Sequence, residues 1–254
     1  SYAHDRAGNV ITSSVGGAVT VFRYDAMNNL ARIDCGDGAT WYELLHDSLG
    51  RRIGVRRNGG AWRYDIHAGG ACIASVTNGA VAGFFVRPVH AEGAPAHGDP
   101  FLANVIAEID AAGQTHYHVA NHRGDTVAVL DGDAVVEAAY RYDAFGNVTI
   151  ESGSFLPRDA FCGYEYLPEP NLYLSAWRAY DPLSGRWLQR DPYVYRDSAN
   201  LYQFRGNAPV SPAGVDAGGG VTIPGSVPSI GNKEPPVSSS AAERDDPDGL
   251  APRM

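Results

Sequence analysis

A short motif recurs along the chain and leaves few folds open to it: an aromatic residue, an aspartate close behind it, then two residues and a glycine or asparagine. The copies read YAHDRAGNV at 2–10, YDAMNNL at 24–30, HDSLGRRIGV at 46–55 and YDAFGNV at 142–148, with weaker copies RYDIHAGG at 63–70 and IDAAGQ at 109–114. Spacings of 20, 22 and 18 residues separate the aspartates Asp5, Asp25, Asp47 and Asp65. This period predicts one β-hairpin per repeat, and therefore an array of hairpins.

Each copy has the chemistry of a tight turn between two strands. In the copy YDAFGNV we expect Tyr142 to end a strand and Asp143 to accept hydrogen bonds from backbone N–H groups two or three residues on. Gly146 supplies a positive φ, and Asn147 tolerates the same region. A single hairpin cannot bury its apolar face, so the units are expected to stack edge to edge into one extended antiparallel sheet.

The composition agrees with an all-β chain. Glycine (30 residues), proline (16) and tyrosine (14) are abundant, which is typical of many short strands joined by turns. The 254 residues suffice for a sizeable core. The net charge of −9 argues against nucleic acid as the main partner, because phosphate binding needs clustered lysine and arginine. The sequence has no run of 18 apolar residues, so it predicts no transmembrane helix.

The sequence contains none of the usual signatures of an enzyme that acts on an external substrate. We find no GxSxG elbow, no phosphate-cradling glycine loop before a helix and no Cys–His arrangement of a recognisable type. We therefore expect no cofactor. The cysteines Cys35, Cys72 and Cys162 are widely spaced and form no CxxC pair, so we expect them to be buried free thiols.

The ends and one internal stretch depart from the repeat pattern. The chain opens SYAHDRAGNV, in the middle of the pattern and without a signal segment, and we interpret it as a fragment or the last portion of a longer product. Residues 87–104 read as a surface loop. Residues 217–254 are dense in glycine, proline and serine and lack aromatic residues, which predicts a disordered tail.

A segment richer in tyrosine and tryptophan, FCGYEYLPEPNLYLSAWRAYDPLSGRWLQRDPYVY, spans 161–195. Asp181 is expected to open a hairpin turn, with Pro182 in its second position and Gly185 in its left-handed position. Core contacts, rather than a ligand platform, are expected from three aromatic side chains: Tyr173 and Trp177 on one strand face, and Trp187 across the turn.

Residues 197–206, DSANLYQFRG, predict a short helix. Asp197 or Ser198 would serve as its N-cap, and Gly206 would end it.

Together these residues resemble the Rhs family. The Tyr-Asp copies look like its YD repeats, and residues 116–206 are similar to its repeat-associated core domain. The carriers of the resemblance are HYHVANHRGDTVAVLD, YRYDAFGNV, FCGYEYLPEPNLYLSAWRAYDPLSGRW, LQRDP and NLYQFRGNAP. It implies an all-β fold: a spiralling antiparallel sheet of YD-repeat hairpins, part of an Rhs-type β-shell, with a plug-like core segment and one short helix. We assign 1–115 to repeats, 116–216 to the core domain and 217–254 to the tail.

The resemblance also implies a function. In toxin-delivery members of the family, the core plugs the shell, and a variable C-terminal toxin inside is cut free by aspartate-dependent self-cleavage. We expect a structural scaffold that encapsulates or displays a C-terminal polypeptide. Its partners would be its own C-terminal or upstream polypeptide, and the secretion apparatus or cell-surface glycans. The full-length protein would be secreted or at the cell surface. The alternative is a cell-surface carbohydrate- or protein-binding module, because aromatic-lined β surfaces also bind sugars.

The self-cleavage implied by the family would centre on Asp191, with Arg190 beside it to stabilise negative charge. Two carboxylates held close cannot both ionise, and such a pair can activate water or a peptide carbonyl. The family's second motif, Asp-Pro-x-Gly-Leu, is altered here. Asp216 lies 25 residues after Asp191 without the proline and leucine, and an intact DPDGL begins 55 residues after it, at Asp246. Asp191 therefore has two interpretations: it belongs to an intramolecular aspartyl autoprotease, or it forms a plain Asp-Pro turn.

Two further motifs have alternative interpretations. His116, His118 and His122 could take zinc by their spacing, but no cysteine pair or HExxH helix accompanies them, and we expect no metal. The Arg-Gly-Asp tripeptide at 123–125 could suggest adhesion, but we expect it to fill a repeat turn.

Overall fold

The computed structural model describes residues 1–68, 71–87, 104–192 and 199–210. Within them a 14-stranded antiparallel sheet runs from β1 to β14 in chain order, beside a 4-stranded sheet, β15 to β18, which confirms the all-β prediction. The large sheet contains β1 (Tyr2–His4), β2 (Val10–Val15), β3 (Ala18–Tyr24), β4 (Leu30–Asp34), β5 (Trp41–His46), β6 (Arg52–Arg57), β7 (Arg63–Ala68), β8 (Ala71–Thr77), β9 (Ala80–Val86), β10 (Ala107–Asp110), β11 (Thr115–Ala120), β12 (Thr126–Leu130), β13 (Val136–Tyr142) and β14 (Val148–Gly153). The small sheet contains β15 (Glu165–Leu167), β16 (Leu172–Leu174), β17 (Ala179–Asp181) and β18 (Arg186–Trp187).

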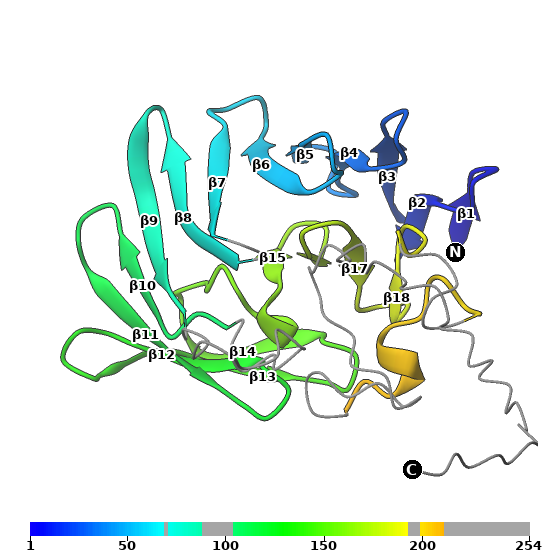
Figure 1. The fold of residues 1–254 in the computed structure, drawn as a ribbon. Coiled ribbons are helices and arrows are strands. Elements are labelled where there is room, and N and C mark those ends of the chain that lie inside the picture. The colour runs from blue at the N-terminus through cyan, green and yellow to red at the C-terminus, as the bar shows by residue number, and fades with distance from the viewer. Residues whose placement is uncertain (69–70, 88–103, 193–198, 211–254) are drawn as a thin grey trace, which may run out of the picture.

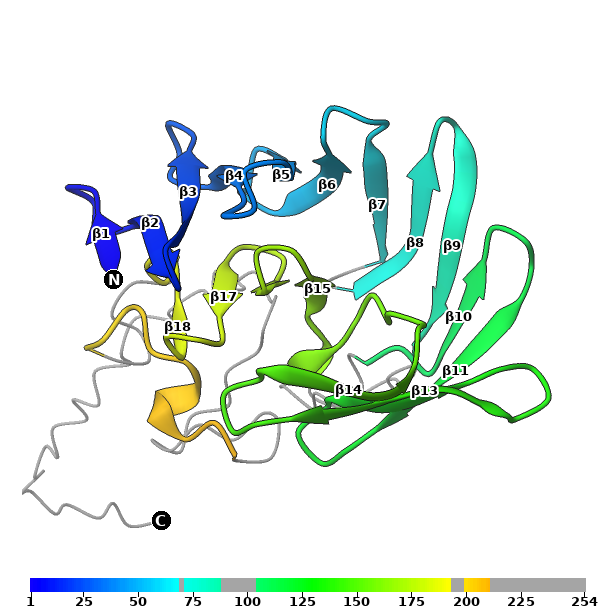
Figure 2. The same ribbon diagram turned by 180° about the vertical axis from the view of Figure 1, so that it is seen from behind.

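The large sheet curves around the small one (Figures 1 and 2). Its first six strands pass over the small sheet, β7 to β9 close one side, and β10 to β14 pass beneath it. We call the large sheet the wall, and residues 154–192 with 199–210 the plug segment. Because each wall strand pairs with its neighbours in the sequence, the wall is one continuous spiral of hairpins. The expected spiralling sheet is therefore present.

The repeated turns share one geometry. At Asp25 the backbone N–H donates to the carbonyl of Asn29 at 2.9 Å, and Oδ1 accepts the N–H groups of Met27 and Asn29, both at 2.9 Å. The carboxylate therefore binds N–H groups two and four residues on, rather than two and three. The same pattern occurs at Asp5, Asp47, Asp110, Asp131 and Asp143.

The third residue after each anchor adopts left-handed backbone. At Gly146 φ is 97°, as predicted. A Cβ added to Gly146 would lie 2.6 Å from the ring of Phe161, so glycine also permits close packing of the turn on the plug segment. Asn147 does not adopt positive φ, and that expectation is wrong. Its side-chain Nδ2 instead donates to Oδ2 of Asp143 at 2.7 Å, which holds the carboxylate in place.

The tyrosine that precedes the aspartate ties its strand to the preceding one. The hydroxyl of Tyr24 on β3 donates to the carbonyl of Val10 on β2 at 2.7 Å, and that of Tyr142 on β13 donates to the carbonyl of Thr126 on β12 at 3.0 Å. A largely buried hydroxyl needs such a partner. This explains tyrosine rather than phenylalanine at these two positions.

Asp65 does not anchor a turn, contrary to the prediction. It lies inside β7, paired in register with Ser75 of β8, and is 6% exposed. Its carboxylate binds Arg52 and Arg158 instead of the N–H groups of a turn. The regular spacing of the first four aspartates therefore joins three turn anchors with one buried strand residue.

The small sheet is buried on both faces. Leu172 and Leu174 of β16 pack against strands β2 to β6, whereas Tyr173 between them points to the opposite side. The first face belongs to a core formed by Val10, Phe22, Leu30, Ile33, Cys35, Tyr42, Leu44, Val55, Leu167, Leu172, Leu174, Ala179 and Leu188. The second belongs to an aromatic core of Phe161, Tyr164, Tyr173, Tyr180, Trp187 and Phe204, with Tyr142 of the wall packed against it. The small sheet is therefore an interior element.

The core contacts expected of Tyr173 and Trp187 are confirmed, with exposed fractions of 0% and 5%. Trp177 is half-buried in the loop between β16 and β17, so it does not share a strand face with Tyr173.

The helix expected over 197–206 does not form in the described part of that range. Residues 199–204 adopt turns and bends, with an isolated bridge between Gln203 and Arg186. One turn of 3-10 helix follows, η4 (Arg205–Asn207), interrupted by Gly206 at φ 60°. Phe204 packs in the aromatic core, and the carbonyl of Tyr202 accepts a hydrogen bond from the N–H of Trp187. These tertiary contacts override the local helix signal. The proposed caps, Asp197 and Ser198, lie outside the described residues.

The three cysteines are free and buried, as predicted. Most of the expected surface loop, residues 88–103, and the expected tail, residues 217–254, lie outside the described residues. The division of the chain at residue 115 stays a prediction, and the wall itself is continuous through Gly153.

Candidate functional site

Wall and plug segment are joined by backbone hydrogen bonds at equivalent repeat positions. The wall donors and plug acceptors pair as Val10 with Leu188 (3.0 Å), Arg52 with Ala176 (2.7 Å) and Thr126 with Ala160 (3.1 Å). Each donor is the fifth residue after a turn anchor: Asp5, Asp47 or Asn121. The same position of each of these repeats thus directs a backbone N–H group to the interior. The plug segment accepts hydrogen bonds from three such groups.

A cluster of buried charges lies at the same interface. We call it the inner charge cluster: Arg52 on β6, Arg63 and Asp65 on β7, Arg158 before β15, and Glu165 on β15. Arg52 reaches Asp65 at 2.9 Å and Glu165 at 2.7 Å. Arg158 reaches the same two carboxylates at 3.0 and 3.2 Å. Arg63 also pairs with Glu165. Wall and plug segment are therefore cross-linked by shared ion pairs.

Burial makes these contacts strong determinants of the fold. The side chains of Asp65 and Glu165 are 1% and 4% exposed. Burial by itself would raise the pKa of Glu165, but the three guanidinium groups around it outweigh burial and hold its pKa well below the usual range. Burial acts the other way on Arg158, and the carboxylates of Glu165 and Asp65 raise its pKa well above the usual value. Glu165 and Arg158 are therefore both charged near neutral pH.

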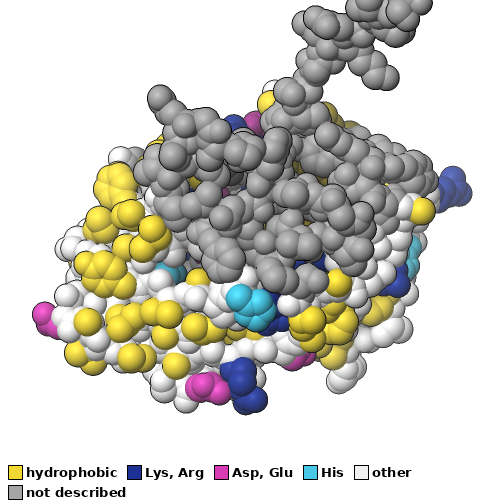
Figure 3. Space-filling model, turned by 60° about the horizontal axis from the view of Figure 1, so that its bottom comes forward, with side chains coloured by type: hydrophobic (Ala, Val, Ile, Leu, Met, Phe, Trp, Pro, Cys, Tyr) yellow, Lys and Arg dark blue, Asp and Glu magenta, His cyan; other side chains and the backbone are white. Residues whose placement is uncertain are grey.

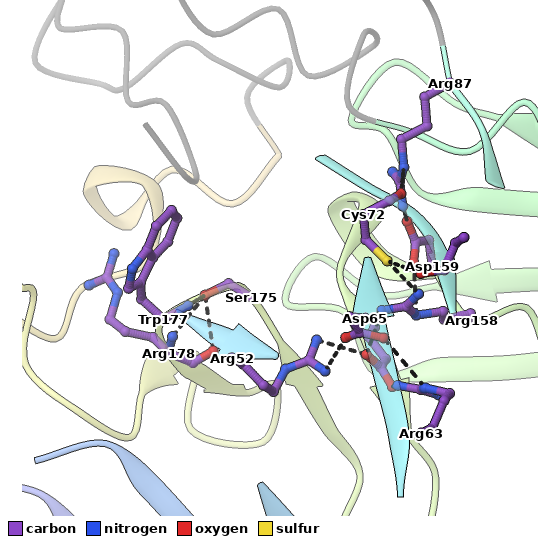
Figure 4. A network of polar contacts seen from close by, with 12 residues as sticks. Arg52, Arg63, Asp65, Cys72, Arg87, Arg158, Asp159, Ser175, Trp177 and Arg178 are labelled. Atoms are coloured by element: carbon purple, nitrogen blue, oxygen red, sulfur yellow. Dashed lines mark hydrogen bonds and ion pairs between the residues drawn. The ribbon is translucent and has the colours of Figure 1, made fainter. Parts of the chain in front are cut away.

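Figure 4 shows how the cluster continues toward β8 and β9. Nη1 of Arg158 donates to Sγ of Cys72 at 3.0 Å, and its guanidinium lies 4.7 Å over the ring of Phe85. Arg87 binds the Cys72 carbonyl at 2.6 Å and pairs with Asp159. The plug residues Arg158 and Asp159 thus connect to three successive wall strands, β7, β8 and β9.

A cavity of about 410 Å³ opens beside the cluster between wall and plug segment. Its lining includes Arg56, Arg63 and Glu108 of the wall and Arg158, Glu165 and Tyr166 of the plug segment. Burial raises the pKa of Glu108, and the carboxylate of Asp159 adds to the effect. The cavity beside the plug segment is therefore lined by charged as well as apolar side chains, unlike the apolar core under β2 to β6.

Asp191 lies in the plug segment, next to β18, and its side chain is 20% exposed. Its carboxylate binds Nη1 of Arg178 at 2.8 Å, and its N–H donates to the carbonyl of Leu201 at 2.9 Å. The Arg178 guanidinium also stacks 4.2 Å over the ring of Trp187. Arg190, expected beside the carboxylate, is exposed. Asp191 is thus held at a fixed place by an arginine that the sequence did not indicate.

The two aspartates considered as partners of Asp191, Asp216 and Asp246, lie outside the described residues. Asp181 is a turn residue, as predicted: its Oδ1 accepts the N–H of Leu183 at 2.9 Å, and Gly185 adopts a φ of 67°. Its other carboxylate oxygen accepts the hydroxyl of Tyr2 at 2.8 Å, which ties the plug segment to the first wall strand.

The three histidines considered as zinc ligands lie in different environments. His116 Nδ1 is 2.6 Å from Glu137 and packs on the ring of Phe155, whereas His118 is buried, and burial lowers its pKa to about 4. His122 is exposed in a turn. In the described ranges, no three His, Cys, Asp or Glu residues are grouped closely enough to hold a metal ion.

The Arg-Gly-Asp tripeptide fills a repeat turn, as predicted. Gly124 takes the left-handed position, at φ 85°, of the turn that begins at Asn121. Arg123 and Asp125 are 6% and 0% exposed and bind each other at 2.8 Å. Neither charge is available to a partner at the surface.

The inner charge cluster was missed by reasoning from sequence. Asp65 was assigned to a turn, and Glu165 stood in a segment interpreted as aromatic core. The available signal was the pair Arg63 and Asp65 at alternate positions of a strand whose other face carries Tyr64 and Ile66. Such alternation marks a strand with one charged and one apolar face, but it does not say which face is inside.

Comparisons with known proteins agree with this fold. Residues 102–210 match the family model of the teneurin YD-shell. The tRNA nuclease WapA of Bacillus subtilis is 36% identical over 101 residues, which are 37% of this chain and 4% of WapA. Double-stranded DNA deaminase toxin A of Burkholderia cenocepacia is 25% identical over 230 residues, which are 81% of this chain and 16% of the toxin. The chain thus spans a small part of these relatives.

Among solved structures, the crystal structure of TcdB2-TccC3 has the same fold, with a TM-score of 0.56 at 20% identity over 84% of this chain and 11% of that one. TcdB2-TccC3 without its hypervariable C-terminal region gives a TM-score of 0.53 at 17% identity, over 85% of this chain and 13% of that one. A curved wall of Tyr-Asp hairpins around an inner sheet defines a β-shell repeat protein. The chain is similar to the Rhs/YD-repeat family, in sequence over residues 102–210 and in the fold of its wall.

Proposed function

We propose that this part of the shell helps to enclose a C-terminal polypeptide of the same protein. The observation that carries the proposal is the small sheet, which is buried on both faces on the inner side of the wall. A wall that already folds around one segment of its own chain, with a cavity beside that segment, is suited to shield a further segment from solvent.

The relatives support the same interpretation. WapA is named a tRNA nuclease and the Burkholderia protein a DNA deaminase toxin, and this chain matches only 4% and 16% of their lengths. The activity in those names would then belong to other parts of those proteins, and the matched part would be the container. TcdB2-TccC3 is described with a hypervariable C-terminal region, which is the kind of polypeptide that we expect here.

The experiment is limited proteolysis of the full-length gene product. We expect the C-terminal polypeptide to resist protease while the shell is folded, and to become sensitive at the denaturant concentration that unfolds the shell. The same polypeptide expressed without the shell is the control, and it should be digested at once. Equal digestion rates with and without the folded shell would contradict enclosure.

A second candidate activity is self-cleavage that depends on Asp191. In a working pair of aspartates, one carboxylate is ionised and the other carries a proton. The ion pair with Arg178 at 2.8 Å holds the Asp191 carboxylate in a fixed place, which supports Asp191 as one member of such a pair. Its place at the end of the described plug strands lets residues further along the chain approach it. The other member would be Asp216 or Asp246.

Replacing Asp191 by asparagine tests this activity by intact mass. We expect the parent chain to lose a C-terminal piece and the Asp191→Asn variant to keep its full mass. Arg178→Lys keeps the charge but not the fork geometry, so it should slow cleavage. Asp181→Asn is the matched control in a neighbouring turn. If parent and Asp191→Asn stay uncut, both here and in the full-length product, Asp191 has only its structural role.

A further inference from the structure

The outer face of the wall changes character along the sheet. Over β3 to β6 it carries a ladder of charges, in which Arg23 pairs with Arg32, Arg32 with Glu43 and Glu43 with Arg56 in the strand register. The Arg32–Glu43 ion pair measures 3.5 Å. On β13 and β14 the exposed pair Arg141–Glu151 measures 3.0 Å. These stretches have the polar outer face that is usual for a sheet with one side in water.

Between them the polarity is reversed. The register of β7 to β11 places exposed apolar side chains in adjoining rows on the outside. We call these residues the outer apolar face: Tyr64 (42% exposed), Ile66 (45%), Phe84 (49%), Val86 (46%), Tyr117 (46%) and Val119 (44%). The charged partners of these strands, Arg63 and Asp65, lie on the inner side. Figure 3 shows hydrophobic side chains gathered along this side of the molecule.

The outer apolar face has the size of a patch that is often functional. The exposed fractions of its six side chains correspond to about 500 Å² of accessible area, near the upper end for the largest patch on a monomer. Val81 and Val136, at 42% and 55% exposed, extend it toward the roughly 800 Å² that each partner buries in a stable complex. No charged residue interrupts the described rows.

We propose that the outer apolar face is the surface through which two copies of this chain form a dimer. The chain has a net charge of −9, and contact through a face without charge would bring two copies together without placing like charges opposite each other. A dimer with a twofold axis brings the same patch together from both copies, which suits a face that is uniformly apolar. A membrane surface is the poorer partner, because the chain is acidic overall and the rows of the outer apolar face themselves carry no lysine or arginine.

The test is the molecular mass of the 254-residue chain by analytical ultracentrifugation over a wide range of concentration. We expect the mass of two chains for the parent. Val86→Asp and Val119→Asp would each place an unpaired carboxylate in the interface, and should raise the dimer dissociation constant by about tenfold or more. Far-ultraviolet circular dichroism and the unfolding temperature of each variant will show that the fold is kept.

The matched control is Val19→Asp. Val19 lies on β3, on the same outer face of the same sheet, and is 48% exposed, but it pairs with Ser14 of β2 and lies on the strand that carries Arg23 of the charged ladder, outside the outer apolar face. It should leave the dissociation constant unchanged. A monomeric parent, a dimer that survives both Val86→Asp and Val119→Asp, or equal dissociation by Val19→Asp would overturn the proposal. A monomeric parent that binds phosphatidylcholine vesicles would overturn it in favour of a lipid partner.

Discussion

Replacing Glu165 by glutamine is expected to lower the free energy of unfolding by about 3–5 kcal/mol. Glu165 is 4% exposed and shares the inner charge cluster with three arginines and Asp65. Without its charge, the buried guanidinium groups of Arg52 and Arg158 and the partly exposed one of Arg63 remain around one carboxylate, and their lost hydration is no longer offset. Chemical denaturation followed by tryptophan fluorescence measures the change. The plug segment should loosen from β6 and β7 first, which hydrogen exchange of those strands would show.

The control is Glu151→Gln. Glu151 pairs with Arg141 on the outer face, and its side chain is 51% exposed, so its loss should cost about 0–1 kcal/mol. Similar losses in the two variants would contradict the role given to the cluster.

Acid should reduce the difference between parent and Glu165→Gln. The pKa of Glu165 is lower in the folded state than in the unfolded state. The charge of Glu165 therefore stabilises the fold fully above the unfolded pKa of about 4.3, and this stabilisation is lost as the pH falls through the folded pKa. The two unfolding free energies should therefore differ fully at neutral pH and converge below about pH 4.3.

Truncating Phe161 to alanine is expected to cost about 3–5 kcal/mol. Phe161 is fully buried, and its ring centroid lies 5.5 Å from that of Tyr173, 5.9 Å from Tyr180 and 5.7 Å from Phe204. It also contacts the turn at Gly146, so the cavity would separate plug segment and wall as well as loosen the aromatic core. Thermal and chemical unfolding measure the loss.

Phe145→Ala is the matched comparison, because Phe145 belongs to the same turn but is 44% exposed. Its loss should cost at most about 1 kcal/mol. A cost for Phe161→Ala no larger than that of Phe145→Ala would show that the aromatic core can collapse around the missing ring.

The turns were predictable because their chemistry is local. An aspartate that accepts N–H groups two and four residues on needs only its own turn, so Asp25 and Asp143 could be assigned from five residues each. The stacking of hairpins follows from the repeat, because no hairpin can bury its face alone. The all-β class and the extended sheet follow from these two facts, whereas the spiral of the wall was implied by the resemblance to Rhs proteins.

The inner charge cluster could not be predicted in the same way. Asp65 has the sequence neighbourhood of a turn residue, and what decides its role is Arg158, 93 residues further on, together with Arg52. The helix predicted for this part of the chain, residues 199–206, is wrong for a similar reason. Its capping signals are those of a helix, but Phe204 contributes more by packing on Tyr180 at 4.3 Å than by lying in an isolated helical turn. The partner of Asp191, Arg178, became apparent only from the structure.

The order of pairing has a consequence for synthesis on the ribosome. Val10 pairs with Leu188, and Tyr2 binds Asp181 across 179 residues of sequence. Strands β1 to β6 are translated before the leucines that cover their inner face, which come from residues 167–188. At about 5–20 residues per second, this apolar face waits on the order of ten seconds for its cover. The inner face of the nascent wall therefore stays uncovered until residues 167–188 have been made.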